Sequence, residues 1–154
     1  MTVYFFDSSA LVKRYVAEIG SAWVMSLCNP TLKSTVFIAA ITAVEITAAI
    51  SRRFRGGSVS YTDATTVYHQ LRNDIQSEYQ VIEITDIIIN SAMALAEKHG
   101  LRGYDAVQLA GAKAINNLCI ANSLHPLTFI SADQELNNAA VNEGLVVDNP
   151  NDHP

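Results

Sequence analysis

Short apolar runs alternate along this chain with longer segments of helical spacing, and this alternation limits the folds open to it. The runs are rich in β-branched and aromatic residues and lie at 2–6, 34–40, 80–84, 127–130 and 145–147. Helical spacing or helix end signals mark the segments 8–17, 21–27, 42–54, 61–78, 86–99, 103–118 and 133–142. Strands that alternate with helices require right-handed crossovers, which produce a parallel sheet covered on both faces. We therefore predict an α/β fold, a three-layer α/β/α sandwich with a central parallel sheet.

The chain has the size and composition of one globular domain. Of its 154 residues, 49% are hydrophobic and only 16% are charged, which excludes a disordered protein. We expect the domain to span residues 1–148, since no repeat, linker or low-complexity segment interrupts it. Residues 149–154 are polar and contain two prolines, so we expect a flexible tail there.

The start of the chain and its cysteines favour a cytoplasmic protein without a membrane anchor. Asp7 interrupts the first apolar run and no basic segment precedes it, which argues against a signal peptide. No apolar run reaches the roughly 18 residues that a membrane span needs. Cys28 and Cys119 lie in apolar helical segments and are expected to be buried free thiols.

Four acidic residues occupy places where an apolar run gives way to a helix. Asp7 and Asp133 follow strands directly, and Glu45 and Asp105 lie near the starts of apolar helices. The carboxyl ends of parallel strands line one crevice, which is where such sheets bind ligands. Carboxylates crowded together repel one another, and a divalent cation is the compact way to neutralise them. The four acids therefore predict a metal site.

Each acid also has a purely structural explanation. Asp7 and Asp133 can be helix N-caps, and Asp105 can complement a helix dipole. Thr42 and Glu45 have the spacing of a capping box, in which the glutamate hydrogen-bonds to the threonine backbone. The joint pattern favours the metal site, because Asp105 begins the most apolar helix, where an unpaired charge is costly to bury.

Basic residues are the candidates for contact with nucleic acid. The net charge of −5 gives no general attraction to RNA, so contact would depend on local patches. The candidate residues are Lys13, Arg14, Arg52, Arg53 and Arg55. The three arginines end a helix, where cations suit the helix dipole without any ligand, so both interpretations stay open.

Other chemistries find little support. The four histidines lack zinc-ligand spacing, and no phosphate-binding glycine motif or nucleophile elbow is present. An aspartyl-phosphate phosphatase also begins with an aspartate after the first strand. That chemistry expects a second aspartate two residues later, where this chain has Ser9.

Four segments together resemble a known family. In chain order they are Phe5-Phe6-Asp7-Ser8-Ser9-Ala10-Leu11, the helix of Glu45, Gly103-Tyr104-Asp105-Ala106-Val107-Gln108-Leu109-Ala110 and Phe129-Ile130-Ser131-Ala132-Asp133. Over nearly the whole chain this set resembles the PIN domain, most closely the VapC-type toxins of bacterial toxin–antitoxin pairs. Relatives often carry a further acid and an aromatic residue after the last ligand, whereas this chain has Gln134-Glu135-Leu136.

The resemblance implies a ribonuclease that depends on Mg²⁺ or Mn²⁺ and leaves a 5′-phosphate and a 3′-hydroxyl. It implies that Asp7, Glu45, Asp105 and Asp133 are the metal ligands and catalytic acids, with Ser8 and Ser131 supporting them. It further implies an RNA substrate, a VapB-like protein antitoxin and a homodimer. Two alternatives remain: a PIN-like nuclease of RNA processing without an antitoxin, and a non-catalytic PIN-like module for RNA binding or assembly.

Overall fold

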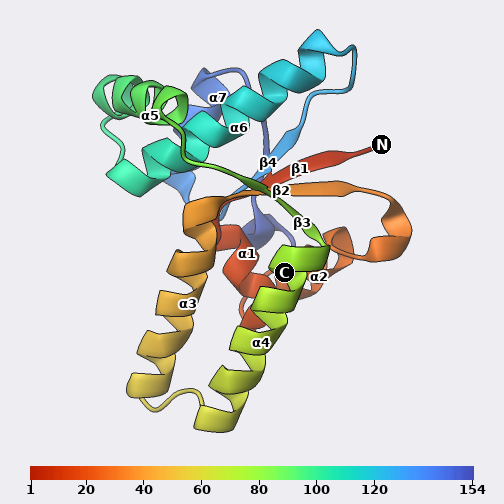
Figure 1. The fold of residues 1–154 in the computed structure, drawn as a ribbon, viewed down its shortest axis with the longest axis vertical. Helices are drawn as coiled ribbons and strands as arrows, with labels where there is room; N and C mark the ends of the chain where they lie inside the picture. Colours follow the sequence, from red (N-terminus) through yellow and green to blue (C-terminus); the bar gives the residue numbers. More distant parts are fainter.

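The computed structural model describes residues 1–154 and contains one parallel sheet (Figure 1). The five strands have the order β3-β2-β1-β4-β5, and every neighbouring pair is parallel. They are β1 (Val3–Phe6), β2 (Thr35–Ala39), β3 (Tyr79–Ile82), β4 (Thr128–Ile130) and β5 (Val146–Asp148). Strand β1 is central, with β2 and β3 on one side of it and β4 and β5 on the other. The predicted α/β architecture with a parallel sheet is confirmed.

Seven α-helices and two short 3₁₀ helices connect the strands. The α-helices are α1 (Ser8–Tyr15), α2 (Ser21–Leu27), α3 (Ala40–Arg55), α4 (Tyr61–Ser77), α5 (Asp86–His99), α6 (Gly103–Ala121) and α7 (Gln134–Asn142). The 3₁₀ helices are η1 (Pro30–Leu32) and η2 (Pro150–Asp152). Helix α2 has the predicted bounds, whereas α3 begins at Ala40, two residues before the predicted start. Gly100 ends α5 with φ of 67°, a left-handed conformation that suits glycine.

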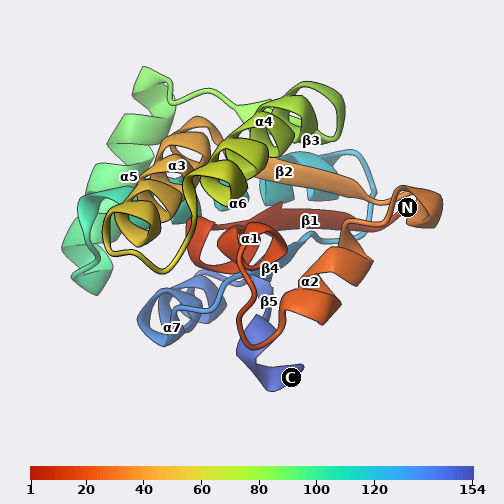
Figure 2. The same cartoon turned by 90° about the horizontal axis from the view of Figure 1, so that it is seen from below.

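The sheet separates two hydrophobic cores. Successive residues of a strand point to opposite faces, so Phe5 packs with α5, α6 and α7 while Phe6 packs with α1, α3 and α4. Both phenylalanine side chains are fully buried. Figure 2 shows α1, α2 and α4 on the near side of the sheet and α6 behind it. At Gly111 of α6, a Cβ atom would lie 3.2 Å from the Phe5 ring, so a small residue permits this close packing.

The end of the chain packs against α2. The Trp23 and His153 rings stack with centroids 4.0 Å apart, and Pro150 is buried. Gly20 has φ of 85°, and a Cβ atom there would collide with the Pro150 carbonyl oxygen. The sequence predicts a flexible tail over residues 149–154; in the structure this segment contains a short 3₁₀ helix and contacts α2.

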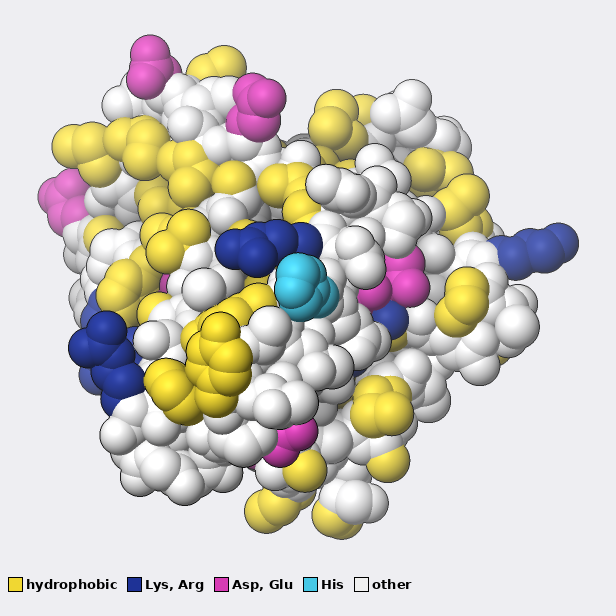
Figure 3. Space-filling model, turned by 60° about the horizontal axis from the view of Figure 1, so that its bottom comes forward, with side chains coloured by type: hydrophobic (Ala, Val, Ile, Leu, Met, Phe, Trp, Pro, Cys, Tyr) yellow, Lys and Arg dark blue, Asp and Glu magenta, His cyan; other side chains and the backbone are white.

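Hydrophobic side chains remain exposed along α5. Ile87 is 80% exposed and Met93 is 65% exposed. Figure 3 shows hydrophobic side chains gathered at the upper left of that view, on the side where α5 lies. None of the helices combines the length and hydropathy that crossing a membrane requires. Both cysteines are buried free thiols, as the sequence predicted.

Candidate functional site

The four predicted acids line one cavity at the carboxyl ends of β1 and β4. Its volume is about 180 Å³. The residues that line it are Asp7, Ser8, Ser9, Glu45, Arg102, Tyr104, Asp105, Gln108 and Asp133. The structure therefore brings together side chains that lie up to 126 positions apart in the sequence, since the set runs from residue 7 to residue 133.

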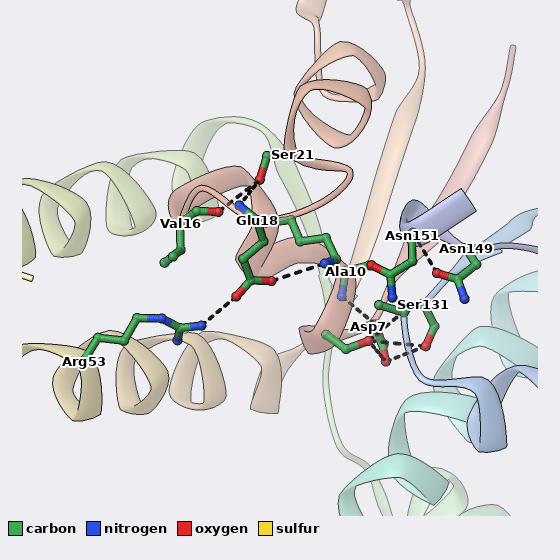
Figure 4. A network of polar contacts seen from close by, with 12 residues as sticks. Asp7, Ala10, Val16, Glu18, Ser21, Arg53, Ser131, Asn149 and Asn151 are labelled. Atoms are coloured by element: carbon green, nitrogen blue, oxygen red, sulfur yellow. Dashed lines mark hydrogen bonds and ion pairs between the residues drawn. The ribbon is translucent and has the colours of Figure 1, made fainter. Parts of the chain in front are cut away.

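Asp7 is the most buried of the acids. It follows β1 and caps α1, because its Oδ1 accepts a hydrogen bond of 3.0 Å from the Ala10 backbone N–H. The Ser9 hydroxyl donates to both carboxylate oxygens, at 2.7 and 2.9 Å, and Ser131 donates to Oδ2 at 2.9 Å (Figure 4). No cation contacts this carboxylate, and its burial raises the pKa of Asp7 to about 7. Asp7 is thus both a helix cap and a charge that lacks a counter-ion.

Two serines connect the ends of β1 and β4. The Ser131 Oγ accepts the Asp133 backbone N–H at 3.1 Å, and the Ser9 Oγ accepts the Ala132 N–H at 2.9 Å. The sequence pointed to Ser131 but missed Ser9, because serines beside a helix start are usually local caps. Asp133 itself caps α7, with Oδ1 accepting from the Leu136 N–H at 3.1 Å.

Glu45 is held by residues from two other helices. Since α3 begins at Ala40 after a non-polar N-cap, Ala39, the alternative explanation of Glu45 as part of a capping box with Thr42 is wrong. Glu45 Oε1 instead accepts hydrogen bonds from Ser8 Oγ at 2.7 Å and Gln108 Nε2 at 3.1 Å. Ser8 therefore supports Glu45, whereas Ser131 supports Asp7.

The remaining acid, Asp105, lies among other negative charges. Desolvation, together with the charges of Asp133 and Glu45, raises the pKa of Asp105 to about 6. Arg102 is the one basic residue that lines this cavity. Its pKa is raised by a hydrogen bond with Tyr104 and by the nearby acids. One exposed arginine on the rim leaves most of the acidic charge without a partner.

The chemistry of these side chains fits a hard divalent cation. The available donors are carboxylate and hydroxyl oxygens, which suit Mg²⁺ and Mn²⁺, and no cysteine or histidine lines the cavity. No group of three or more acidic, histidine or cysteine side chains converges closely enough to hold an ion directly. Mg²⁺ usually keeps several waters and contacts one or two carboxylates. Acids that share a cavity without converging fit that mode of binding.

The predicted RNA-contacting residues divide into two groups. Lys13 is 6% exposed and pairs with Glu18 at 3.2 Å, while Arg14 pairs with Glu78 at 2.8 Å. Both side chains are thus engaged by carboxylates inside the fold. Arg52 and Arg53 instead line a groove of about 530 Å³ that runs along α3.

This groove adjoins the acidic cavity. Ser8, Ser9, Glu45 and Tyr104 line both spaces. Arg53 is also bonded to Glu18, at 2.6 Å, as Figure 4 shows, whereas Arg52 forms no ion pair. Arg55 lies exposed at the end of α3. The surface around the acids therefore combines negative charge at the centre with arginines at one side.

Comparison with known proteins gives sequence and structural relatives. Ribonucleases VapC45 and VapC49 of Mycobacterium tuberculosis are each 29% identical over 120 residues, which cover 76% of this chain and 79% of theirs. No family model matches the chain.

The solved structures show the same fold at low identity. FitAcB from Neisseria gonorrhoeae has a TM-score of 0.64 and 18% identity, with coverage of 96% of this chain and 97% of that one. PAE2754 from Pyrobaculum aerophilum has a TM-score of 0.62 and 19% identity, with coverage of 95% and 83%. VapBC2 from Rickettsia felis, bound to a DNA fragment from its promoter, has a TM-score of 0.59, 14% identity and coverage of 96% and 98%. By sequence the chain is thus a relative of the VapC ribonucleases and by fold a relative of the VapBC and FitAcB proteins, which confirms its resemblance to the VapC-type PIN-domain toxins.

Proposed function

We propose that this chain is an endoribonuclease that hydrolyses RNA phosphodiester bonds with the help of Mg²⁺ or Mn²⁺, and that it is the toxin of a toxin–antitoxin pair. The observation that carries this proposal is the single cavity lined by Asp7, Glu45, Asp105 and Asp133, whose negative charge is opposed only by Arg102 on the rim. The ribonuclease activity of the mycobacterial VapC relatives supports the choice of substrate.

The acids have distinct places in the proposed site. Asp7 is fixed by Ser9 and Ser131 and is the anchor of the cation site, shared with Asp105. Glu45 and Asp133 complete the ligand set directly or through water, and Ser8 orients Glu45. The chemistry that a divalent cation would supply there is activation of water and neutralisation of the charge that develops on the phosphate. The expected products carry a 5′-phosphate and a 3′-hydroxyl.

RNA is held by the arginines next to the acids. Because the chain carries a net charge of −5, attraction to RNA must be local. Arg102 lies on the rim of the cavity, and Arg52 and Arg53 line the adjoining groove. In this arrangement the arginines contact the phosphates that flank the scissile bond and the acids hold the cation.

The partner that silences the nuclease is a VapB-like antitoxin. VapBC2 and a toxin–antitoxin complex from Klebsiella pneumoniae share the fold of this chain. An antitoxin arginine placed among the acids would replace the charge of the cation, because a guanidinium binds carboxylates in a bidentate manner.

The chain also forms a homodimer through the apolar surface of α5 and α6, where a groove of about 390 Å³ is lined by Ile89, Met93 and Val107.

The test of this proposal is cleavage of a structured RNA by the purified protein. We expect cleavage with Mg²⁺ or Mn²⁺, none with EDTA, and 5′-phosphate ends on the products. The Asp7→Asn variant, purified in the same way, should lose most of the activity and keep the fold by circular dichroism. Cleavage that persists in EDTA and in the variant would contradict the proposal. RNA binding without cleavage would favour the non-catalytic module instead.

A further inference from the structure

Gln108 is a buried amide in the wall of the acidic cavity that the proposed function does not yet use. It lies on α6, one helical turn after Asp105, and is 1% exposed. A polar side chain buried to this extent normally satisfies all its hydrogen-bonding groups. In Gln108 only the amide nitrogen forms hydrogen bonds.

The nitrogen of this amide meets three acceptors. Nε2 lies 2.8 Å from Thr42 Oγ1, 3.1 Å from Ser8 Oγ and 3.1 Å from Glu45 Oε1. The oxygen, Oε1, is buried and has no hydrogen-bond partner. The amide nitrogen is thus fully hydrogen-bonded, whereas the amide oxygen has no hydrogen-bond partner.

The charge of Glu45 fixes this orientation. If the amide were turned over, its oxygen would face Glu45 Oε1, and two acceptors would repel each other. Leaving a buried carbonyl unpaired costs about 1–3 kcal/mol. The hydrogen bonds from Nε2 to Glu45, Ser8 and Thr42 therefore outweigh this cost.

The same contacts distinguish the two oxygens of Glu45. Both hydrogen bonds to this carboxylate, from Ser8 and Gln108, arrive at Oε1. Oε2 receives none from the protein. Ser8 also contacts Thr42, at 3.4 Å, so Thr42 of α3 supports the two residues of α1 and α6 that hold this carboxylate oxygen.

We propose that Gln108 is a positioning residue: with Ser8 it occupies Oε1 of Glu45, while Thr42 contacts both donors, and it leaves Oε2 as the oxygen that Glu45 offers to a divalent cation. This inference rests on the metal site of the proposed function, and it extends the site to a residue that contacts no cation itself. Groups that orient a metal ligand typically change metal affinity about 10–100-fold when removed.

The experiment measures Mn²⁺ binding to the intact protein by isothermal titration calorimetry, without RNA. Gln108→Met keeps the side-chain length and removes the amide. We expect its dissociation constant for Mn²⁺ to rise about 10-fold. Its metal-free melting temperature should change little, since the substitution removes an unpaired carbonyl together with the hydrogen bonds that Nε2 donates. Asn116→Ala is the matched control, because Asn116 is a buried amide on the same helix whose Oδ1 accepts the Leu127 N–H at 3.1 Å, outside the cavity.

A double-mutant cycle separates positioning from general packing. If Gln108 acts through Glu45, Gln108→Met should change Mn²⁺ affinity by less than about twofold in a Glu45→Gln background. Equal effects in both backgrounds, or wild-type affinity in Gln108→Met, would overturn the inference. A wild-type protein that binds no Mn²⁺ would overturn this inference together with the metal site. Mn²⁺ binding without RNA cleavage would overturn the proposed function alone.

Discussion

Ser131 donates a hydrogen bond of 2.9 Å to Asp7 Oδ2, and the two residues lie 124 positions apart. The same hydroxyl oxygen accepts the Asp133 N–H, so one side chain ties the end of β4 to the end of β1. This bond joins two of the four acids into one unit, and the geometry of the site depends on it.

We expect Ser131→Ala to weaken both the fold and the activity. The substitution leaves Asp7 with fewer donors, which should cost about 1–3 kcal/mol of unfolding free energy. RNA cleavage should fall about 10–100-fold, because the anchor of the site loses its orientation. Urea denaturation and initial cleavage rates measure the two effects. Ser34→Ala, which removes a hydroxyl bonded to the Leu27 carbonyl elsewhere in the fold, should leave cleavage unchanged.

Asp7 should make the metal-free protein less stable as the pH rises. Its pKa is raised to about 7 in the folded state, so the folded protein holds this proton more tightly than the unfolded chain does. The stability that the Asp7 proton contributes is therefore fully present below the ordinary pKa of 3.8, and it is lost as the pH rises through about 7. Asp7→Asn lacks this charge, so in EDTA it should become more stable than the wild type as the pH rises from 5 to 8, roughly by a few degrees in Tm.

Saturating Mn²⁺ should reduce that difference, because a bound cation neutralises Asp7 in the wild type. Thermal denaturation at both pH values, with EDTA and with Mn²⁺, tests the prediction. Parallel pH profiles for the two proteins would show that the Asp7 charge does not oppose folding.

Glu143 should contribute stability that is independent of the site. Its carboxylate accepts from Lys98 and Lys113 at 2.7 Å and from His99 at 3.3 Å, joining α5 and α6 to the end of α7. Hydrogen bonds from Lys113 and Lys98 lower its pKa to about 2, from the ordinary 4.5. The contribution is therefore present above pH 4.5 and disappears as the pH falls towards 2.

Glu143→Gln should lower the unfolding free energy at pH 7 by about 0.5–1 kcal/mol, because Lys98 is largely exposed and such pairs are weak. The difference from the wild type should shrink below pH 4. Chemical denaturation across this range measures it. Cleavage of RNA should stay at the wild-type rate, and a loss of activity would mean that α7 transmits the change to Asp133.

Arg52 and Arg102 should act on RNA binding rather than on the cation. Replacing either arginine with alanine should raise KM for RNA several-fold. The steepness of the plot of log RNA affinity against log salt concentration should fall by about 1. Mn²⁺ affinity should change little. Arg72→Ala is the control, since Arg72 is exposed on α4 and lines neither the cavity nor the groove. An equal loss of RNA affinity in Arg72→Ala would contradict a local basic contact.

The sequence predicts the strands and the positions of the acids well, because both follow from local pattern. Phe5 and Phe6 lie in a continuous apolar run, which is typical of a strand buried on both faces. Asp7 and Asp133 follow such runs, so the shared edge of a parallel sheet brings them together. Gly100 ends its helix as expected.

Contacts between distant polar residues are not visible in the sequence. Thr42 and Glu45 have the spacing of a capping box, yet a glutamine 63 positions after Glu45 binds the carboxylate instead. Gln108 lies within an apolar helix, where nothing local indicates a partner. Lys13 also looks like a surface residue in the sequence, but Glu18 pairs with it inside the fold.

The central place of β1 in the sheet has a consequence for synthesis of the protein. The second neighbour of β1 is β4, so β1 cannot complete its pairing until the chain has been made as far as Ile130. Asp133 follows β4 and emerges from the ribosome later still. A growing chain therefore cannot assemble the four acids of the cavity before Asp133 has been made, and the proposed activity waits for residues synthesised long after β1.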